Sequence, residues 1–161
     1  MNFSPKEQNR TAVSLVGVHP ALVAIVQRAM VLCPQPFTVY EGLRTRERQR
    51  ALMSMGVSKT MESKHISGDA VDLVPLVDGK LSWTWEHTYP IADAMSQAAK
   101  VLPPEDAWLQ WGGAWGTNLG NWASSAKDAS KDYLDRCKKI GKVPFSDGPH
   151  FELIHRGPHG I

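Results

Sequence analysis

Runs of apolar and β-branched residues along the chain predict several short strands. Residues 70–77 are apolar apart from one aspartate and are expected to enter a core, and residues 37–42 are rich in β-branched and aromatic side chains. Residues 107–111 form a further short run that ends at two glycines. Asp78-Gly79 predicts a hairpin turn, with residues 80–85 as the returning strand. These runs predict a small antiparallel sheet.

Other segments carry the signals of helix ends. Proline is favoured in the first turn of a helix, so the apolar stretch over residues 20–32 is expected to be a mostly buried helix. Thr45 is suited to cap a second helix, which Gly56 ends. Two more helices are expected over residues 86–101 and 126–140, and the second is exposed and rich in lysine and aspartate. A sheet with flanking helices places the chain in the α+β class.

Length and composition indicate an ordinary globular domain. A chain of 161 residues with 42% hydrophobic and 21% charged residues is expected to form a single domain with its own core. The net charge of +2 is too small to indicate nucleic-acid binding. Residues 1–10 lack the apolar core of a signal peptide, and residues 12–32 are interrupted by polar pairs, which argues against membrane insertion. We therefore expect the protein to be made and held in the cytoplasm.

His65 and Asp72 are two candidate metal ligands on either side of Gly68. On an unbroken strand, residues seven apart point to opposite faces, and such a pair could not share an ion. The segment Ser67-Gly68-Asp69 can break the alternation, because glycine tolerates a positive φ. Asp72 would then lie on the same strand face as Ala70, and the pair becomes possible. A catalytic zinc site usually has three protein ligands, so one more is needed.

The best third ligand is His150, at the start of an apolar run that is typical of a strand. With His65 and Asp72 it gives a mixed nitrogen and oxygen set suited to zinc, and it leaves Asp147 on the preceding Gly-Pro turn to handle protons. A simple turn residue is the alternative for Asp147. Glu152 shares a strand face with His150, which makes it a second candidate base or a partner that orients a ligand.

Competing residues leave some of these roles open. His155 and His159 are the nearest alternatives to His150 as third ligand, since both follow it closely in the sequence. Ser63 is a hydrogen-bonding support rather than a nucleophile, because no histidine is placed in sequence to activate it. Trp111 and Trp115 could line a cleft for a peptide, and they could equally belong to the core.

Four segments in the order found here are shared with one enzyme family. They are Glu41 to Gln49, Ser63-x-His65-x-x-Gly68-x-Ala70-x-Asp72-Leu73, Trp111-Gly112-Gly113, and Asp147-x-x-His150-Phe151-Glu152. In these motifs the chain resembles the zinc D-alanyl-D-alanine carboxypeptidase family. Within that family it looks most like the phage endolysins that act as L-alanyl-D-glutamate endopeptidases.

The resemblance implies a hedgehog/DD-peptidase-like zinc peptidase fold and a function in host cell lysis. His65, Asp72 and His150 would bind zinc, Asp147 would be the proton-handling acid, and Arg44 would steady the substrate carbonyl. From the residues alone, a surface arginine beside other arginines is the alternative for Arg44. The expected substrate is the L-Ala–D-Glu bond in peptidoglycan stem peptides, reached with the help of a holin. We expect the protein to act as a monomer.

Two other functions are compatible with the resemblance. One is a D-alanyl-D-alanine carboxypeptidase or dipeptidase, and the other is a non-catalytic wall-binding module that keeps zinc as a structural ion. Residues 116–146 depart from the compact pattern expected of the phage enzymes and are interpreted as an inserted helical segment. This segment is either a solvated decoration or a lid that contacts the wall.

Overall fold

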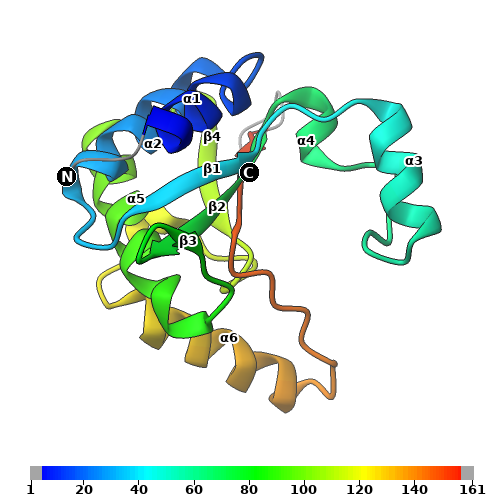
Figure 1. The fold of residues 1–161 in the computed structure, drawn as a ribbon. Helices are drawn as coiled ribbons and strands as arrows, with labels where there is room; N and C mark the ends of the chain where they lie inside the picture. The colour runs from blue at the N-terminus through cyan, green and yellow to red at the C-terminus, as the bar shows by residue number, and fades with distance from the viewer. Residues whose placement is uncertain (1–4, 157–161) are drawn as a thin grey trace.

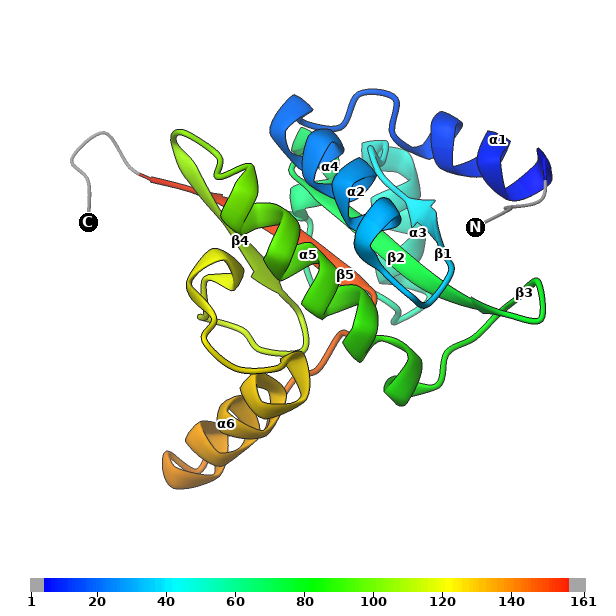
Figure 2. The same ribbon diagram turned by 90° about the vertical axis from the view of Figure 1, so that its left-hand side faces the viewer.

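An antiparallel sheet forms the centre of the computed structural model, which describes residues 5–156. Four strands are hydrogen-bonded side by side in the order β1 (Phe37–Glu41), β2 (Ala70–Val77), β5 (His150–His155) and β4 (Ala107–Trp111). The short β3 (Lys80–Leu81) pairs with the C-terminal end of β2. The last strand that the structure describes, β5, therefore lies inside the sheet, between β2 and β4, which precede it (Figures 1 and 2).

Helices lie on both sides of this sheet. They are α1 (Pro5–Ser14), α2 (Pro20–Leu32), α3 (Arg46–Ser54), α4 (Lys64–Ser67), α5 (Tyr89–Val101) and α6 (Ala126–Lys139), with short 3-10 turns at Trp85–His87 and Leu119–Asn121. The helices α2 and α5 pack against each other on one side of the sheet, and α3 lies on the opposite side (Figures 1 and 2). None of the helices that the structure describes has the length and apolar character needed to cross a membrane.

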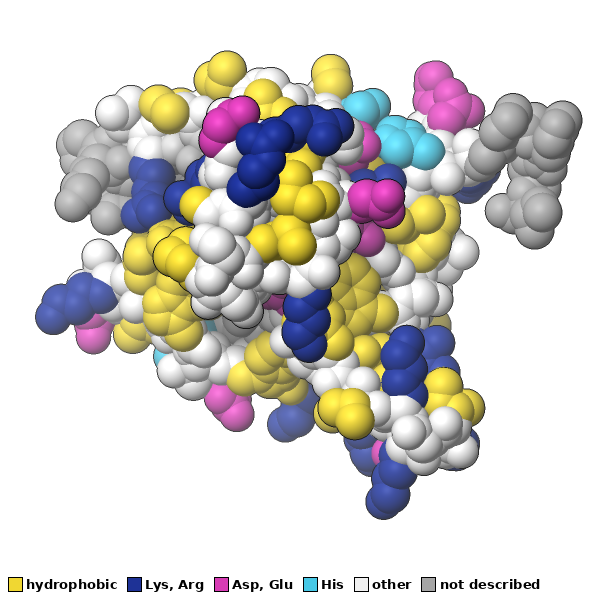
Figure 3. Space-filling model, turned by 90° about the vertical axis from the view of Figure 1, so that its right-hand side faces the viewer, with side chains coloured by type: hydrophobic (Ala, Val, Ile, Leu, Met, Phe, Trp, Pro, Cys, Tyr) yellow, Lys and Arg dark blue, Asp and Glu magenta, His cyan; other side chains and the backbone are white. Residues whose placement is uncertain are grey.

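The alternation of side chains along the strands separates a core face from a polar face. On the core face, odd-numbered residues of β2 and β5 such as Val71, Leu73, Phe151 and Leu153 pack under α2 and α5. Even-numbered residues of the same strands point to the other face, where α3 and α4 lie. Figure 3 views the molecule from this second side, and basic and apolar side chains gather in its lower part, over the end of α6.

The structure confirms the α+β class and most of the predicted elements. The predicted strand over residues 70–77 and the predicted helix over residues 20–32 are found with those bounds. The returning strand predicted over 80–85 is wrong beyond Leu81, because a 3-10 turn begins at Trp85. The helix predicted from residue 86 begins instead at Tyr89, since Pro90 starts a new helix after that turn.

Candidate metal centre

Two neighbouring strands bring a carboxylate and an imidazole together on the polar face. Asp72 in β2 lies directly opposite His150 in the antiparallel β5, so the two side chains leave the sheet side by side. The next even position of β5, Glu152, lies opposite Ala70 and shares the same face. The strand register proposed for His150 is therefore found.

A one-turn helix delivers the third group. Ser63 caps α4 by accepting a hydrogen bond from the backbone N–H of His65, and Gly68 ends the helix in the left-handed conformation with φ of 78°. A side chain at Gly68 would also meet the Gly17 carbonyl oxygen at 2.4 Å. This glycine is the predicted break in the alternation, and it places His65 over the start of β2 with only 2% of its side chain exposed.

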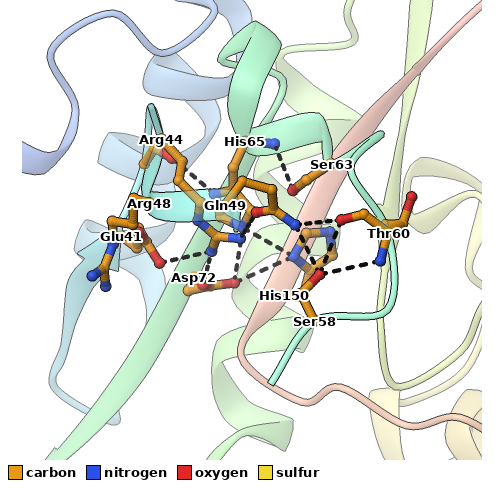
Figure 4. Close-up of polar contacts among 11 residues, drawn as sticks. Glu41, Arg44, Arg48, Gln49, Ser58, Thr60, Ser63, His65, Asp72 and His150 are labelled. Carbon is orange, nitrogen blue, oxygen red and sulfur yellow. Dashed lines mark hydrogen bonds and ion pairs between the residues drawn. The ribbon is translucent and has the colours of Figure 1, made fainter. Parts of the chain in front are cut away.

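Three ligand atoms from these elements form a nearly equilateral triangle. His65 Nε2 lies 3.3 Å from Asp72 Oδ1 and 3.3 Å from His150 Nδ1, and His150 Nδ1 lies 3.2 Å from Asp72 Oδ1. At bond lengths of about 2.0–2.1 Å, two ligands of a tetrahedral metal ion lie roughly 3.3 Å apart. The triangle thus has the dimensions of three corners of a tetrahedral site (Figure 4).

Each imidazole has a hydrogen-bond acceptor beside its outer nitrogen, so its inner nitrogen presents a lone pair to the triangle. His65 Nδ1 lies 2.8 Å from the Gly42 carbonyl oxygen and His150 Nε2 lies 3.1 Å from a Glu152 carboxylate oxygen. Both oxygens accept, so these ring nitrogens carry the hydrogens in the neutral tautomers. The opposite nitrogens and Asp72 Oδ1 are then three acceptors that face one another. A cation at their centre satisfies all three, and outer partners of this kind are typical of metal ligands.

The electrostatics of the triangle also favour positive charge. When protons rather than a cation occupy the triangle, burial penalises the Asp72 carboxylate, but hydrogen bonds from His150 and His65 hold the pKa of Asp72 well below its ordinary value. Burial likewise lowers the pKa of His150, yet hydrogen bonds to Asp72 and Glu152 outweigh this and raise it to about 10. The centre therefore attracts a proton to the atoms where a divalent cation would bind, and metal binding would displace that proton.

Arg44 lies beside the centre and is not a surface residue. Only 9% of its side chain is exposed, and its guanidinium donates to Glu41 at 2.7 Å and to Gln49 Oε1 at 2.8 Å. It also lies 3.6 Å from Asp72 Oδ2, the oxygen that does not face the histidines. A third donor, Arg44 Nε, is buried and has no hydrogen-bond partner among the described residues. Arg44 is thus held beside Asp72 with donor capacity still unused.

The partners that hold Arg44 were not among the residues predicted from the sequence. A bulge at the end of β1 shifts the register so that Glu41, rather than Tyr40, lies opposite Asp72 and faces the centre. Gln49 is fully buried, and its amide donates to Ser58 Oγ at 2.8 Å and to the Thr60 carbonyl at 2.6 Å (Figure 4). Gln49 therefore ties the loop after α3 to the guanidinium of Arg44.

Asp147 lies at the edge of the centre, on the turn before β5. Its backbone N–H donates to the Gly112 carbonyl at 2.9 Å, and its own carbonyl accepts from the His150 N–H at 3.2 Å. Burial raises the pKa of Asp147, and the balance of attraction to His150 and repulsion from Asp72 leaves it above the ordinary value. A carboxylate with a raised pKa beside a cation-attracting triangle has the properties of a general base.

The two tryptophans have different positions. Trp111 is fully buried, stacks on Phe151 in the core and donates its indole N–H to the Gly148 carbonyl at 2.7 Å. The proposal that it lines a cleft is therefore wrong, because its strand position points to the core face. Trp115 is partly buried against the edge of the core, and its ring centroid lies 5.6 Å from that of His150.

His155, one of the two alternatives to His150, does not join the triangle. His155 ends β5 and its Nε2 lies 2.9 Å from Asp69 Oδ1, where it holds the start of β2. His159 lies outside the described residues. Among the side chains that the structure describes, the group formed by His65, Asp72 and His150 is the one with metal-binding geometry.

Comparison with known proteins places the chain in a family. Residues 1–154 match the sequence profile described as phage L-alanyl-D-glutamate peptidase. The chain is 33% identical over 144 residues to the L-alanyl-D-glutamate peptidase of Escherichia phage T5, a match that spans 87% of this chain and 91% of the phage protein. The chain belongs to the phage L-alanyl-D-glutamate peptidase family.

Two further relatives agree with membership of the phage L-alanyl-D-glutamate peptidase family. The L-alanyl-D-glutamate peptidase of Listeria phage A118 is 31% identical over 83 residues, which are 52% of this chain and 27% of that protein. The crystal structure of the Serratia marcescens L-Ala D-Glu endopeptidase ChiX superposes with a TM-score of 0.67 at 34% identity, over 90% of this chain and 86% of that one. The expected peptidase fold is thereby confirmed.

Proposed function

We propose that this protein is a zinc-dependent endopeptidase that hydrolyses the L-Ala–D-Glu bond of peptidoglycan stem peptides. The observation that carries the metal assignment is the triangle of His65 Nε2, Asp72 Oδ1 and His150 Nδ1, with all three edges at 3.2–3.3 Å. The bond assignment is supported by the family and by the names of its members. Two imidazoles and one carboxylate form a ligand set that suits zinc.

Zinc would polarise the scissile carbonyl and lower the pKa of a water molecule to about 7. Asp147 takes the proton of the attacking water, because its raised pKa makes it a better base than an ordinary aspartate. The same group, once protonated, gives its proton to the leaving amine. One carboxylate therefore serves both halves of the reaction.

Arg44 supplies positive charge where the carbonyl oxygen becomes negative. Its guanidinium is fixed by Glu41 and Gln49 before substrate arrives, so little reorganisation is needed. A donor of this kind contributes roughly 3–4 kcal/mol to transition-state stabilisation. Glu152 acts through His150, whose ring it orients, rather than on the substrate.

Digestion of purified peptidoglycan tests this proposal directly. Cleavage of the L-Ala–D-Glu bond creates new glutamate amino termini, which are identified by labelling free amines before and after digestion. Chelation should stop the reaction and zinc should restore it. Release of free D-alanine would instead show a carboxypeptidase, and binding without cleavage would show a non-catalytic wall-binding module.

The cellular part of the proposal is separate from the chemistry. In phage lysis the enzyme would stay inside the host as a monomer until a holin opens a route to the wall. Expression with and without a holin, followed by turbidity, tests this: lysis without the holin would contradict it. The interpretation of residues 116–146 as an insertion remains a prediction.

A further inference from the structure

A groove of about 600 Å³ opens between α6, the chain that follows it, and Trp115. Its walls combine apolar and aromatic side chains with two cations, and they include Trp115, Tyr133, Arg136, Ile140, Lys142 and Phe145. The groove lies on the side of the molecule seen in Figure 3, where yellow and dark blue side chains meet over the end of α6. Nothing in the proposed chemistry at the metal centre uses this groove.

Trp115 lies between the groove and the metal centre. The indole ring of Trp115 lies 5.6 Å from the His150 ring, centroid to centroid, and stacks on Phe145 at 6.2 Å. Phe145 in turn lies two residues before Asp147. Trp115 therefore packs beside a candidate metal ligand and also lines the groove, which puts the groove next to the metal centre.

The walls of the groove are fixed by hydrogen bonds. The Tyr133 hydroxyl donates to the Phe145 carbonyl at 2.9 Å and accepts from the Phe145 N–H at 3.1 Å, which holds the chain after α6 against the helix. Arg136 donates to the Trp115 carbonyl at 3.0 Å and to Thr117 Oγ1 at 3.1 Å. The groove is thus a preformed surface, and α6 with residues 140–146 builds one side of it.

The charge of the groove is positive and uncompensated. The oxygens that Arg136 contacts are neutral, and no acidic side chain is among the residues that line the groove. No ion pair to Arg136 or Lys142 occurs among the side chains that the structure describes. Lys59, from the loop after α3, adds a third cation, since its ammonium lies 5.6 Å from the Phe145 ring centroid. The groove therefore favours an anionic ligand with an apolar part.

The substrate of the proposed reaction has a group of this kind. Glutamate that is joined to alanine through its amino group keeps two carboxyl groups, and only one of them can continue the chain. The other is a free carboxylate within a few bonds of the scissile nitrogen, and the glutamate side chain adds two apolar methylene groups. Apolar rings can pack on these methylene groups while arginine or lysine pairs with the carboxylate.

We propose that this groove is the subsite for the glutamate side of the scissile bond, with Arg136 and Lys142 attracting the free carboxylate. This inference rests on the proposed function and adds the part of the chain that selects the substrate. It assigns a role to α6 that neither a solvated decoration nor a moving lid has. The preference for a substrate with a free carboxylate then depends on Arg136 and Lys142, which lie outside the metal centre.

The test pairs a charge change in the protein with a charge change in the substrate. Two synthetic stem peptides are used, one with the free glutamate carboxylate and one with that group converted to an amide. Wild-type protein should cleave the free acid about tenfold better in kcat/KM, because two exposed charge pairs of about 0.7 kcal/mol each together give about 1.4 kcal/mol. Lys142→Gln and Arg136→Gln should each reduce this preference, and the double variant should abolish it.

Matched controls separate this result from general damage. Lys131→Gln removes an exposed charge from the same helix outside the groove and should leave the preference unchanged. Lys142→Gln breaks no hydrogen bond among the described residues, so it keeps the test valid if Arg136→Gln disturbs Trp115. A preference that survives in the double variant would overturn the subsite. Failure of wild-type protein to cut either peptide would instead refute the proposed function.

Discussion

Gly112→Ala tests how closely the turn that bears Asp147 must approach the end of β4. A methyl group at Gly112 would lie 2.3 Å from the Asp147 carbonyl oxygen and 2.9 Å from its Cβ, whereas ordinary contacts begin at 3.4 Å. The first partner is backbone, so it cannot rotate away. The turn must therefore move by about 1 Å, and a misplacement of this size near reacting groups costs roughly 100-fold in rate. We expect kcat/KM to fall by about that factor.

The effect should be confined to catalysis and modest instability. Overpacking of this kind destabilises by about 1–3 kcal/mol, which urea unfolding measures. Metal content should fall less than activity, because only one of the three candidate ligands, His150, is linked to Gly112, through a backbone hydrogen bond of 2.9 Å. Gly120→Ala is the matched control, since its methyl group would lie 3.3 Å from the Asn118 side-chain oxygen and 3.9 Å from the Ala99 carbonyl oxygen. Activity of Gly112→Ala within about threefold of the control would refute the reasoning, because it would show that the position of Asp147 is not limiting.

Three further changes probe the centre. Asp147→Asn should lower kcat by about 10²–10⁴-fold without loss of bound zinc, measured by peptide cleavage and metal analysis. In chelated protein, Asp147→Asn should also raise the free energy of unfolding, and the gain should grow as pH rises from about 4. The reason is that the pKa of Asp147 is raised on folding, so its ionisation destabilises the folded state. Urea unfolding as a function of pH measures this. Gln49→Leu should lower kcat more than it changes zinc affinity, because it removes the hydrogen bonds that hold Arg44 and the loop after α3. Ser58→Ala keeps the contact between Gln49 and Arg44 and should have only a small effect on kcat. Zinc at 100 times its Kd should add about 2.7 kcal/mol to the free energy of unfolding, and His150→Ala should abolish this gain.

The sequence was informative wherever local rules decide the structure. The strand of Asp72 and the break at Gly68 follow from side-chain alternation and the left-handed φ that glycine tolerates, and the structure has both. The same alternation would have placed Trp111 with Leu109 on the core face, so that residue could have been assigned correctly.

The rest of the site depends on contacts between distant segments. The bulge that turns Glu41 toward Arg44 is set by pairing with β2, and nothing within residues 37–42 marks it. Gln49 is buried because a loop folds back over α3, which periodicity along the helix does not reveal. The one signal for Gln49 in the sequence was its position in the shared segment from Glu41 to Gln49. Residues that position a functional side chain are therefore harder to predict from the sequence than the functional side chain itself.

The position of β5 inside the sheet has a consequence for the timing of activity during synthesis. His150 is held between β2 and β4, which are both translated earlier, so the ligand triangle closes only after the ribosome has made the final strand. Nascent chains that stop before β5 would lack one of three ligands and the turn that bears Asp147. Translation products that stop before β5 would accordingly be harmless to the wall, and hydrolysis would require chains that extend through this strand.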